Sequence, residues 1–457
     1  MTDPASDAPR PQYGVIFLVL FLDLVGFSII FPLFPSILEF YWENEGEGSL
    51  FRELIAAIQR FSGAEEASDW RVMTLFGGAL GSLYSLLQFI ASPIWGTISD
   101  RVGRRPVLLL TVAGLAGSYA LWAFASSFTL LVVSRLVGGF MSGNLATATA
   151  AMADSTSRAD RAKGMGIVGA AFGLGFILGP AVGGACSYVD LSGGDPTSLW
   201  NPFSLSALAA CALSIVNLLW IARGFRETLP PEARGKGAGR VNPLALLGAR
   251  FGAAIQRTNL AYFTFLAAFS GMEFTLTFLV TDRLGWSRAQ ITGMFVYVGL
   301  VLVVVQGGFV RRVAPRYGEK RVAIAGLALV IPGLAILAWA SSSAVLYVGL
   351  TLMGLGSALA IPTLTTLVSL FAPEEEQGRV IGGFRSLGAL ARVVGPIAAA
   401  TAYWRFGNAA PYACGAAVMI LPILIMTGVQ QPDKGPGSGP ETSGPGEAEK
   451  DHSGAAE

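Results

Sequence analysis

The sequence predicts an all-α membrane protein with twelve transmembrane helices in two parallel-related six-helix bundles. Three observations indicate this fold class. The 457 residues are 53% hydrophobic and only 13% charged, about half of the charged share found in soluble domains. The apolar residues gather in twelve runs of about 20 residues, the length that crosses the hydrocarbon core of a bilayer. Landmarks in the first six runs return in the last six.

The twelve predicted spans are joined by mostly short polar loops. The first is too long for the apolar core of a signal peptide and no clear cleavage site follows it, so we expect it to remain as a span. The expected bounds are about 13–38, 72–95, 106–124, 128–153, 164–186, 203–222, 259–281, 291–310, 322–340, 344–371, 380–403 and 409–429.

The predicted division of the chain follows from these spans. It consists of a disordered N-terminus at 1–12, a first bundle at 13–222, a cytoplasmic linker at 223–257, a second bundle at 258–429 and a disordered tail at 430–457. The tail is assigned by its Gly, Pro and Glu content. A long outer loop at 39–71 interrupts the first bundle. Its apolar side chains at helical spacing predict an amphipathic helix at the membrane interface.

The basic residues predict the orientation. With both ends of the chain on one side, that side carries 22 of the 31 Lys and Arg residues, and the opposite side carries six. Positive charge in short loops marks the cytoplasmic side. We therefore expect a multi-pass protein of the cytoplasmic (inner) membrane, with both termini in the cytoplasm.

An internal repeat supports two related halves. Gly103, in the loop after the second span, corresponds to Gly318 after the eighth, an offset of 215 residues. The Gly-Pro pairs that begin at 179 and 395 lie 216 residues apart. Nearly equal offsets indicate duplicated halves related by an axis along the membrane normal.

Three charged side chains inside the spans are candidates for proton coupling, because charge inside a membrane is costly. Asp23 lies about 15 Å into its span, near the midplane, where desolvation favours a protonated carboxyl. A static hydrogen bond is the alternative. Arg135 either pairs with Asp23 or extends towards the outer surface. Glu273 either carries a proton, binds a cationic substrate or faces external water.

A polar turn after the second span is the candidate cytoplasmic gate, and its glycines allow a sharp change of direction. Its residues are Gly96, Asp100, Arg101, Gly103, Arg104 and Arg105. We expect Arg385, near the cytoplasmic start of the eleventh span, to pair with Asp100 and close this gate. The alternatives for Arg385 are solvation and pairing with Glu374, Glu375 and Glu376.

The fifth span is rich in glycine, which allows helices to approach closely. Its candidate residues form a seam that is either tightly packed or pliable between the halves: Gly175, Gly179, Pro180, Gly183 and Gly184. Other polar residues in the spans either line a substrate cavity or bond neighbouring helices. They are Gln88, Asn144, Gln306 and Arg392.

The remaining chemistry of the chain excludes several functions. The cysteines Cys186, Cys211 and Cys414 form no CxxC pair and are interpreted as apolar fillers. The one histidine, His452, lies in the tail, so we expect no histidine metal site or catalytic triad. The sequence also contains no phosphate loop or set of residues typical of a catalytic nucleophile, so we expect no enzymatic activity, cofactor or metal. We further expect a monomer with no nucleic-acid partner.

Three stretches of the first half resemble the major facilitator superfamily. Gly-x3-Asp-Arg-x-Gly-Arg-Arg at 96–105 resembles its cytoplasmic loop signature. The run ending Gly-Pro-x2-Gly-Gly at 179–184 looks like the signature of its antiporters. Residues 153–166 are similar to the tetracycline-resistance branch. The resemblance implies that the acid and arginines of 96–105 help to hold an outward-facing state.

Two further motifs resemble twelve-span drug:proton antiporters of that superfamily. Asp23 followed by Gly26 and Pro32 resembles their first-span motif, and Arg135 with Gly139 their fourth-span motif. The resemblance ties Asp23 and Arg135 to proton coupling. The repeated loop of the second half departs from the family pattern, because Pro315 and Glu319 replace its acid and first arginine.

We therefore predict a proton-coupled antiporter that exports a small amphipathic, drug-like molecule by alternating access, as in drug efflux and antibiotic resistance. A cation or neutral compound is the expected substrate. One alternative is a proton-linked importer or uniporter of a small nutrient. Another is a non-transporting membrane scaffold or receptor. The expected partners are the substrate, protons and the lipid bilayer.

Overall fold

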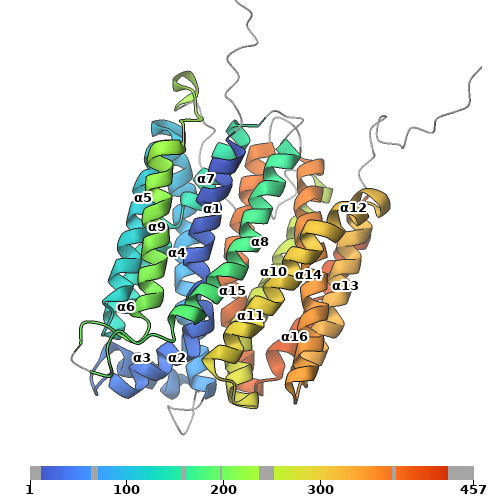
Figure 1. The fold of residues 1–457 in the computed structure, drawn as a ribbon. Helices are drawn as coiled ribbons and strands as arrows, with labels where there is room; N and C mark the ends of the chain where they lie inside the picture. Colours follow the sequence, from blue (N-terminus) through green and yellow to red (C-terminus); the bar gives the residue numbers. More distant parts are fainter. Residues whose placement is uncertain are drawn as a thin grey trace, which may run out of the picture.

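The computed structural model describes residues 12–62, 70–156, 161–195, 198–235, 252–372 and 377–430. Within these ranges the regular structure is entirely helical, and twelve segments are long and apolar enough to span a membrane. Figure 1 shows them as one bundle of roughly parallel rods. The predicted fold class is therefore confirmed.

The helices of the first half include two, α3 and η3, that lie outside the membrane spans. The helices of this half are α1 (Tyr13–Ser28), η2 (Phe31–Leu33), α2 (Phe34–Asn44), α3 (Leu50–Ser62), α4 (Trp70–Val102), α5 (Arg104–Ala123), α6 (Phe128–Met141), α7 (Asn144–Asp154), α8 (Arg161–Cys186), α9 (Ser204–Gly224) and η3 (Pro231–Ala233).

The second half contains a π-helical turn, η6, between two α-helices. Its elements are α10 (Ala253–Leu284), α11 (Arg288–Val304), η6 (Val305–Val310), α12 (Arg311–Tyr317), α13 (Glu319–Ala338), α14 (Ser343–Phe371), α15 (Gln377–Phe406), α16 (Ala410–Val418) and α17 (Ile420–Thr427).

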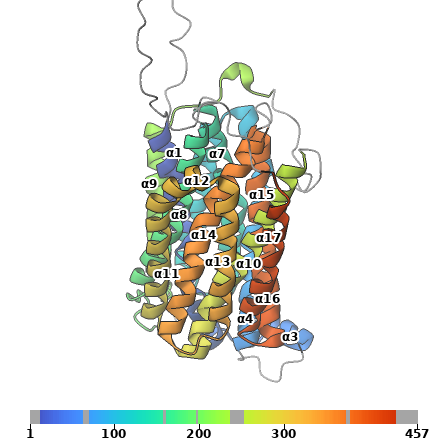
Figure 2. The ribbon, with the colours of Figure 1, turned by 90° about the vertical axis from the view of Figure 1, so that its right-hand side faces the viewer.

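Two faces of the bundle serve as landmarks. Hydrogen bonds join Gln12 to the backbone of Arg226 at 2.8 and 3.1 Å, and Lys320 Nζ donates to the carbonyl of Thr427 at 3.0 Å. We call the end that holds these residues the terminal face. The opposite end, which holds α3, is the α3 face. Figures 1 and 2 show α12 and α3 at opposite ends of the bundle.

Helix α3 lies within the predicted amphipathic segment and packs its apolar side against the first half. Phe51 is fully buried, with its ring 5.3 Å from Phe76 and 5.0 Å from Phe128. Arg52 stacks 3.8 Å over the Trp42 ring. Glu53 and Arg60 of α3 remain exposed. The long loop is thus fastened to the bundle by aromatic packing.

The two halves touch along two pairs of long helices, α4 with α15 and α8 with α11. Small residues permit the first contact, because a Cβ added to Gly78 would lie 2.6 Å from the Cβ of Ala400. Ser82 donates a 2.9 Å hydrogen bond to the carbonyl of Val393 in the same contact. Such close helix pairs are typical of membrane bundles.

The helix boundaries correct several sequence-based expectations. The predicted turn at 96–105 is mostly helix, because α4 continues to Val102 and α5 begins at Arg104. Only Gly103 turns the chain, with φ of +108° that favours glycine. Helix α10 begins at Ala253, inside the predicted linker. The predicted disordered ends lie almost entirely outside the described residues.

Candidate functional site

A cavity of about 1120 Å³ lies between the two halves. Its walls come from α4, α7 and α8 on one side and from α10, α11, α14 and α15 on the other. It reaches Asp100 and Ile381 at the terminal face. At the α3 face the halves are in contact, since Arg288 Nε donates to Ser36 Oγ at 3.1 Å. The cavity therefore opens towards the terminal face.

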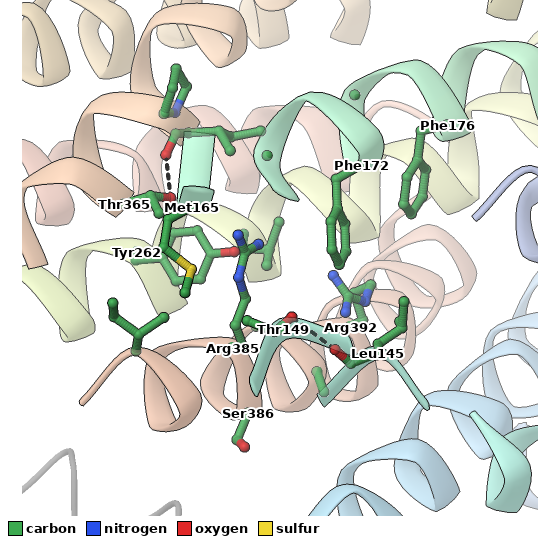
Figure 3. A pocket seen from close by; sticks show the side chains of 18 of the residues that line it. Leu145, Thr149, Met165, Phe172, Phe176, Tyr262, Thr365, Arg385, Ser386 and Arg392 are labelled. Atoms are coloured by element: carbon green, nitrogen blue, oxygen red, sulfur yellow. Dashed lines mark hydrogen bonds between the residues drawn. The ribbon is translucent and has the colours of Figure 1, made fainter. Parts of the chain in front are cut away.

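Two arginines of α15 provide positive charge to this mostly apolar space. Arg385 and Arg392 both line the cavity, two helical turns or about 10 Å apart. The Arg385 guanidinium lies 4.8 Å over the Phe172 ring, and Figure 3 shows Arg392 near the edge of the same ring. Within the described residues, Nε of both arginines and Nη2 of Arg385 have no hydrogen-bond partner.

Three other predicted residues also line the cavity. Glu273 of α10 faces the cavity and interacts electrostatically with Arg392. The alternative that Glu273 faces water outside the bundle is therefore not what the structure has. Gln88 enters from α4 and Gln306 from the π-turn η6. A π-turn re-aims a side chain within a helix and is frequent at functional sites. No pattern in the sequence predicted this π-turn.

Asn144, the fourth predicted cavity residue, does not line the cavity. The fourth span breaks at Ser142 and Gly143, so Asn144 begins the new helix α7. From there its side-chain amide donates a 2.8 Å hydrogen bond to Oδ1 of Asp23. Both side chains are buried, at 1% and 6% exposure. Asp23 is thus held in the interior of the first half, away from the cavity.

Arg135 is buried but makes no ion pair with Asp23. Its guanidinium lies 5.0 Å over the Trp122 ring and about 6 Å from the rings of Tyr84 and Tyr119. Nη2 has no hydrogen-bond partner among the described residues. Arg135 therefore neither pairs with Asp23 nor reaches the surface.

Arg104 forms the centre of an ion-pair network at the terminal face. It donates to Asp100 Oδ1 at 2.5 Å and to Asp154 Oδ2 at 2.9 Å, joining α4, α5 and α7. Ser99 Oγ accepts a further bond at 2.7 Å. Asp100 is therefore paired with Arg104, and the predicted bond to Arg385 is not formed with the cavity open. The alternative partners at 374–376 lie outside the described residues.

Sequence reasoning missed Glu227, which follows α9. Its carboxylate accepts backbone hydrogen bonds from Arg104 at 2.9 Å and Arg105 at 3.1 Å. It also accepts the N–H groups of Thr228 and Leu229, each at 3.0 Å. The carboxylate thus caps α5 and stabilises the positive end of its dipole. An acid just after a span is common, and the α5 residues that Glu227 binds lie 122 and 123 positions earlier, so no local pattern predicts the contact.

The other residues of the predicted gate have different environments. Arg105 donates to the carbonyl of Ala222 at 2.6 Å, which fastens the same turn to the end of α9. Arg101 is exposed. Gly96 is helical and lines the cavity.

The predicted glycine seam lies mainly inside the first half. Gly175, Gly179 and Gly183 face α1, against Leu24, Ser28 and Ile29 respectively. Pro180 is buried within the continuous helix α8. Gly184 faces Thr292 of α11 and is the predicted residue that does reach the other half. The seam is therefore chiefly a tight contact of α8 with α1.

The model of the family described as "Major Facilitator Superfamily" matches residues 16–396, with a second match at 307–451. The chain belongs to the Major Facilitator Superfamily. It is a secondary transporter and not an enzyme. Members of this superfamily are multi-pass membrane proteins, in agreement with the twelve spans.

The similar relatives fall into two groups. The chain is 36% identical to major facilitator superfamily domain-containing protein 10 of Bos taurus over 452 residues, which are 93% of this chain and 95% of that protein. It is 29% identical to the class B tetracycline resistance protein of Escherichia coli over 392 residues, with 85% and 88% covered. The tetracycline-resistance proteins are therefore more distant than the predicted branch implied.

Solved structures agree with this placement. The human organic anion transporter MFSD10 (TETRAN) matches with a TM-score of 0.74 and 34% identity, over 93% of this chain and 100% of that one. A D-xylose-proton symporter matches with a TM-score of 0.69 and 15% identity, over 92% and 97%. The second likeness reflects the shared fold alone.

Proposed function

We propose that this chain is a proton-linked secondary transporter of small amphipathic organic anions, working by alternating access. The observation that carries the proposal is the pair Arg385 and Arg392. Both residues line a cavity otherwise lined mainly by apolar side chains, and among the described residues both keep N–H groups without a hydrogen-bond partner. Guanidinium groups bind carboxylates and sulfonates through charge-assisted hydrogen bonds. A cavity of about 1120 Å³ is large enough for a drug-sized molecule.

The charges favour an anion over the cation or neutral compound expected from the sequence. Asp100 and Asp154 are occupied by Arg104, which leaves Glu273 as the acid facing the two arginines. The similar human protein is described as an organic anion transporter, which supports the same substrate class. Phe172 and Phe176 offer rings to the apolar part of such a molecule.

The direction of coupling has two candidates. The antiporter-like run at 179–184 and the likeness to tetracycline resistance proteins support export of the substrate in exchange for protons. The placement of Glu273 beside Arg392 favours the second candidate, movement of the anion together with a proton.

Three probes of one shape and different charge test the substrate class. Binding of naphthalene-2-sulfonate, naphthalene-2-sulfonamide and 2-naphthylmethylammonium to the full chain in nanodiscs is measured by isothermal titration. The sulfonate should bind at least about tenfold tighter than the neutral probe, as one charge-assisted hydrogen bond implies. Tighter binding of the ammonium probe than of the sulfonate would overturn the proposal.

A further inference from the structure

Helices α10 and α15 approach closely, and this places Glu273 and Arg392 on the same wall of the cavity. A Cβ added to Gly271 would lie 2.6 Å from the carbonyl oxygen of Gly395, so the two backbones meet there. Glu273 lies two residues after Gly271, and Arg392 three residues before Gly395. Both side chains face the cavity.

The two charges interact without being locked to each other. They attract electrostatically, yet among the described residues no ion pair within 4.0 Å or hydrogen bond joins them, and Nε of Arg392 is unbonded. Arg392 therefore keeps donors for a second acceptor. An anionic group that approaches these donors also approaches the Glu273 carboxylate, and like charges repel at such distances.

The neighbouring elements contain few other groups that could replace Glu273. From α15 the second cation is Arg385, and α10 itself adds Tyr262. Helix α16 contributes Tyr412, which is within hydrogen-bond distance of Thr275. Helices α14 and α17 contain no acidic or basic residue.

Helices α4 and α2 of the first half also contact α10. Asp100 of α4 is at the terminal face and bonded to Arg104. Helix α2 contacts α10 through Phe34 and Phe274 and presents Glu39 and Glu43 outside the cavity.

From this geometry we propose that Glu273 is the counter-ion of Arg392 when no substrate is bound. When Glu273 is protonated, the anionic group of the substrate takes its place beside Arg392. This inference rests on the proposed function and deepens it, because the anion and one proton then bind to the cavity together. Linkage requires the effect to be reciprocal: the proton strengthens anion binding as much as the anion strengthens proton binding. Arg385, beside Phe172, serves as the anchor that is free at every pH.

Naphthalene-2-sulfonate is a suitable probe because its charge is fixed between pH 5.5 and pH 8, so any pH dependence belongs to the protein. Its Kd for the full chain in nanodiscs is measured across this range for the wild type, Glu273→Gln, Glu273→Asp and the exposed control Glu53→Gln. The wild-type and control Kd should fall on acidification, by up to about tenfold per pH unit for one linked proton. Glu273→Gln should bind at pH 8 as tightly as the wild type does at pH 5.5, with no pH dependence, and Glu273→Asp should retain it.

Three outcomes would overturn this inference. A wild-type Kd that rises on acidification shows that the proton and the anion compete. If the Kd of Glu273→Gln depends on pH as strongly as that of the wild type, the linked proton binds to another group. Sulfonate binding that does not change with pH refutes the linkage while leaving the anion transporter intact. The proposed function itself fails if the sulfonate binds no better than the neutral sulfonamide at every pH, or less tightly than the ammonium probe. Size-exclusion profiles verify that each variant is folded.

Discussion

Asn144 donates its side-chain amide to Asp23 across the interior of the first half, at 2.8 Å. The bond exists because the fourth span breaks at Gly143 and turns the next residue towards α1. It connects a carboxyl that the membrane disfavours in charged form with the start of a helix that lines the cavity. A change of protonation at Asp23 can therefore alter how α7 is held.

Replacing Asp23 should separate coupling from binding. In Asp23→Asn the shape is kept but the protonatable carboxyl that binds Asn144 is lost, so uphill transport driven by a pH gradient in liposomes should fall to background. Counterflow exchange, which needs no proton gradient, should persist, because Asp23 lies outside the cavity. Asp190→Asn, on an exposed loop, is the matched control. Uphill transport by Asp23→Asn at the wild-type rate would contradict the coupling role.

The two cavity arginines should each contribute strongly to anion affinity. Removing one donor of a charge-assisted hydrogen bond costs about 1.5–3 kcal/mol, so Arg385→Gln and Arg392→Gln should each raise the Kd for naphthalene-2-sulfonate by about 10- to 100-fold. Arg405→Gln, exposed at the other end of α15, should bind as the wild type does. Unchanged affinity for the sulfonate in both cavity variants would show that Arg385 and Arg392 do not bind the anion.

The cap formed by Glu227 should be coupled to the turn at Gly103. Alanine at Gly103 adds backbone strain of about 1–3 kcal/mol at this φ and a contact of 2.9 Å with the Glu227 carboxyl carbon. Gly103→Ala and Glu227→Ala should each lower the thermal midpoint in detergent by about 2–4 °C. The double variant should lose less than the sum, since Glu227→Ala removes the contact. Strict additivity would indicate that the two residues act independently.

The fold was more predictable than the site, for a physical reason. Hydropathy over 20 residues reports membrane spans directly, so the number of spans follows from composition. Site residues depend on how helices pack: the glycines of 175–183 could face either α1 or α11, and their spacing alone does not choose. Breaks such as Ser142–Gly143 and the π-turn at Gln306 redirect single side chains. Such local changes arise from tertiary contacts and leave no periodic pattern.

The Asp100–Arg385 pair also shows this limit, because it depends on a second conformation. With the cavity open to the terminal face, Asp100 binds Arg104. If the pair stabilises the state that closes this face, Asp100→Asn should increase maleimide labelling of a cysteine at Ser386, which lines the cavity, in a background without native cysteines. The control Glu232→Gln, exposed at the same face, should leave labelling unchanged. Equal labelling in Asp100→Asn and the control would count against the gate.

The α3 face should respond in the opposite sense to loss of Arg288. This residue joins α11 of the second half to α2 through Ser36 Oγ, and its guanidinium lies 5.4 Å over Phe203 at the start of α9. Arg288→Gln removes the cation–π contact and weakens the bridge, so the face should open more often. Labelling of a cysteine at Thr292, now packed against Gly184, by an impermeant maleimide should rise. Arg283→Gln is the matched control, because Arg283 binds the carbonyl of Ala338 and the side chain of Asn408 within its own half. A similar rise in both variants would mean that lost helix packing, and not the bridge between halves, exposes Thr292.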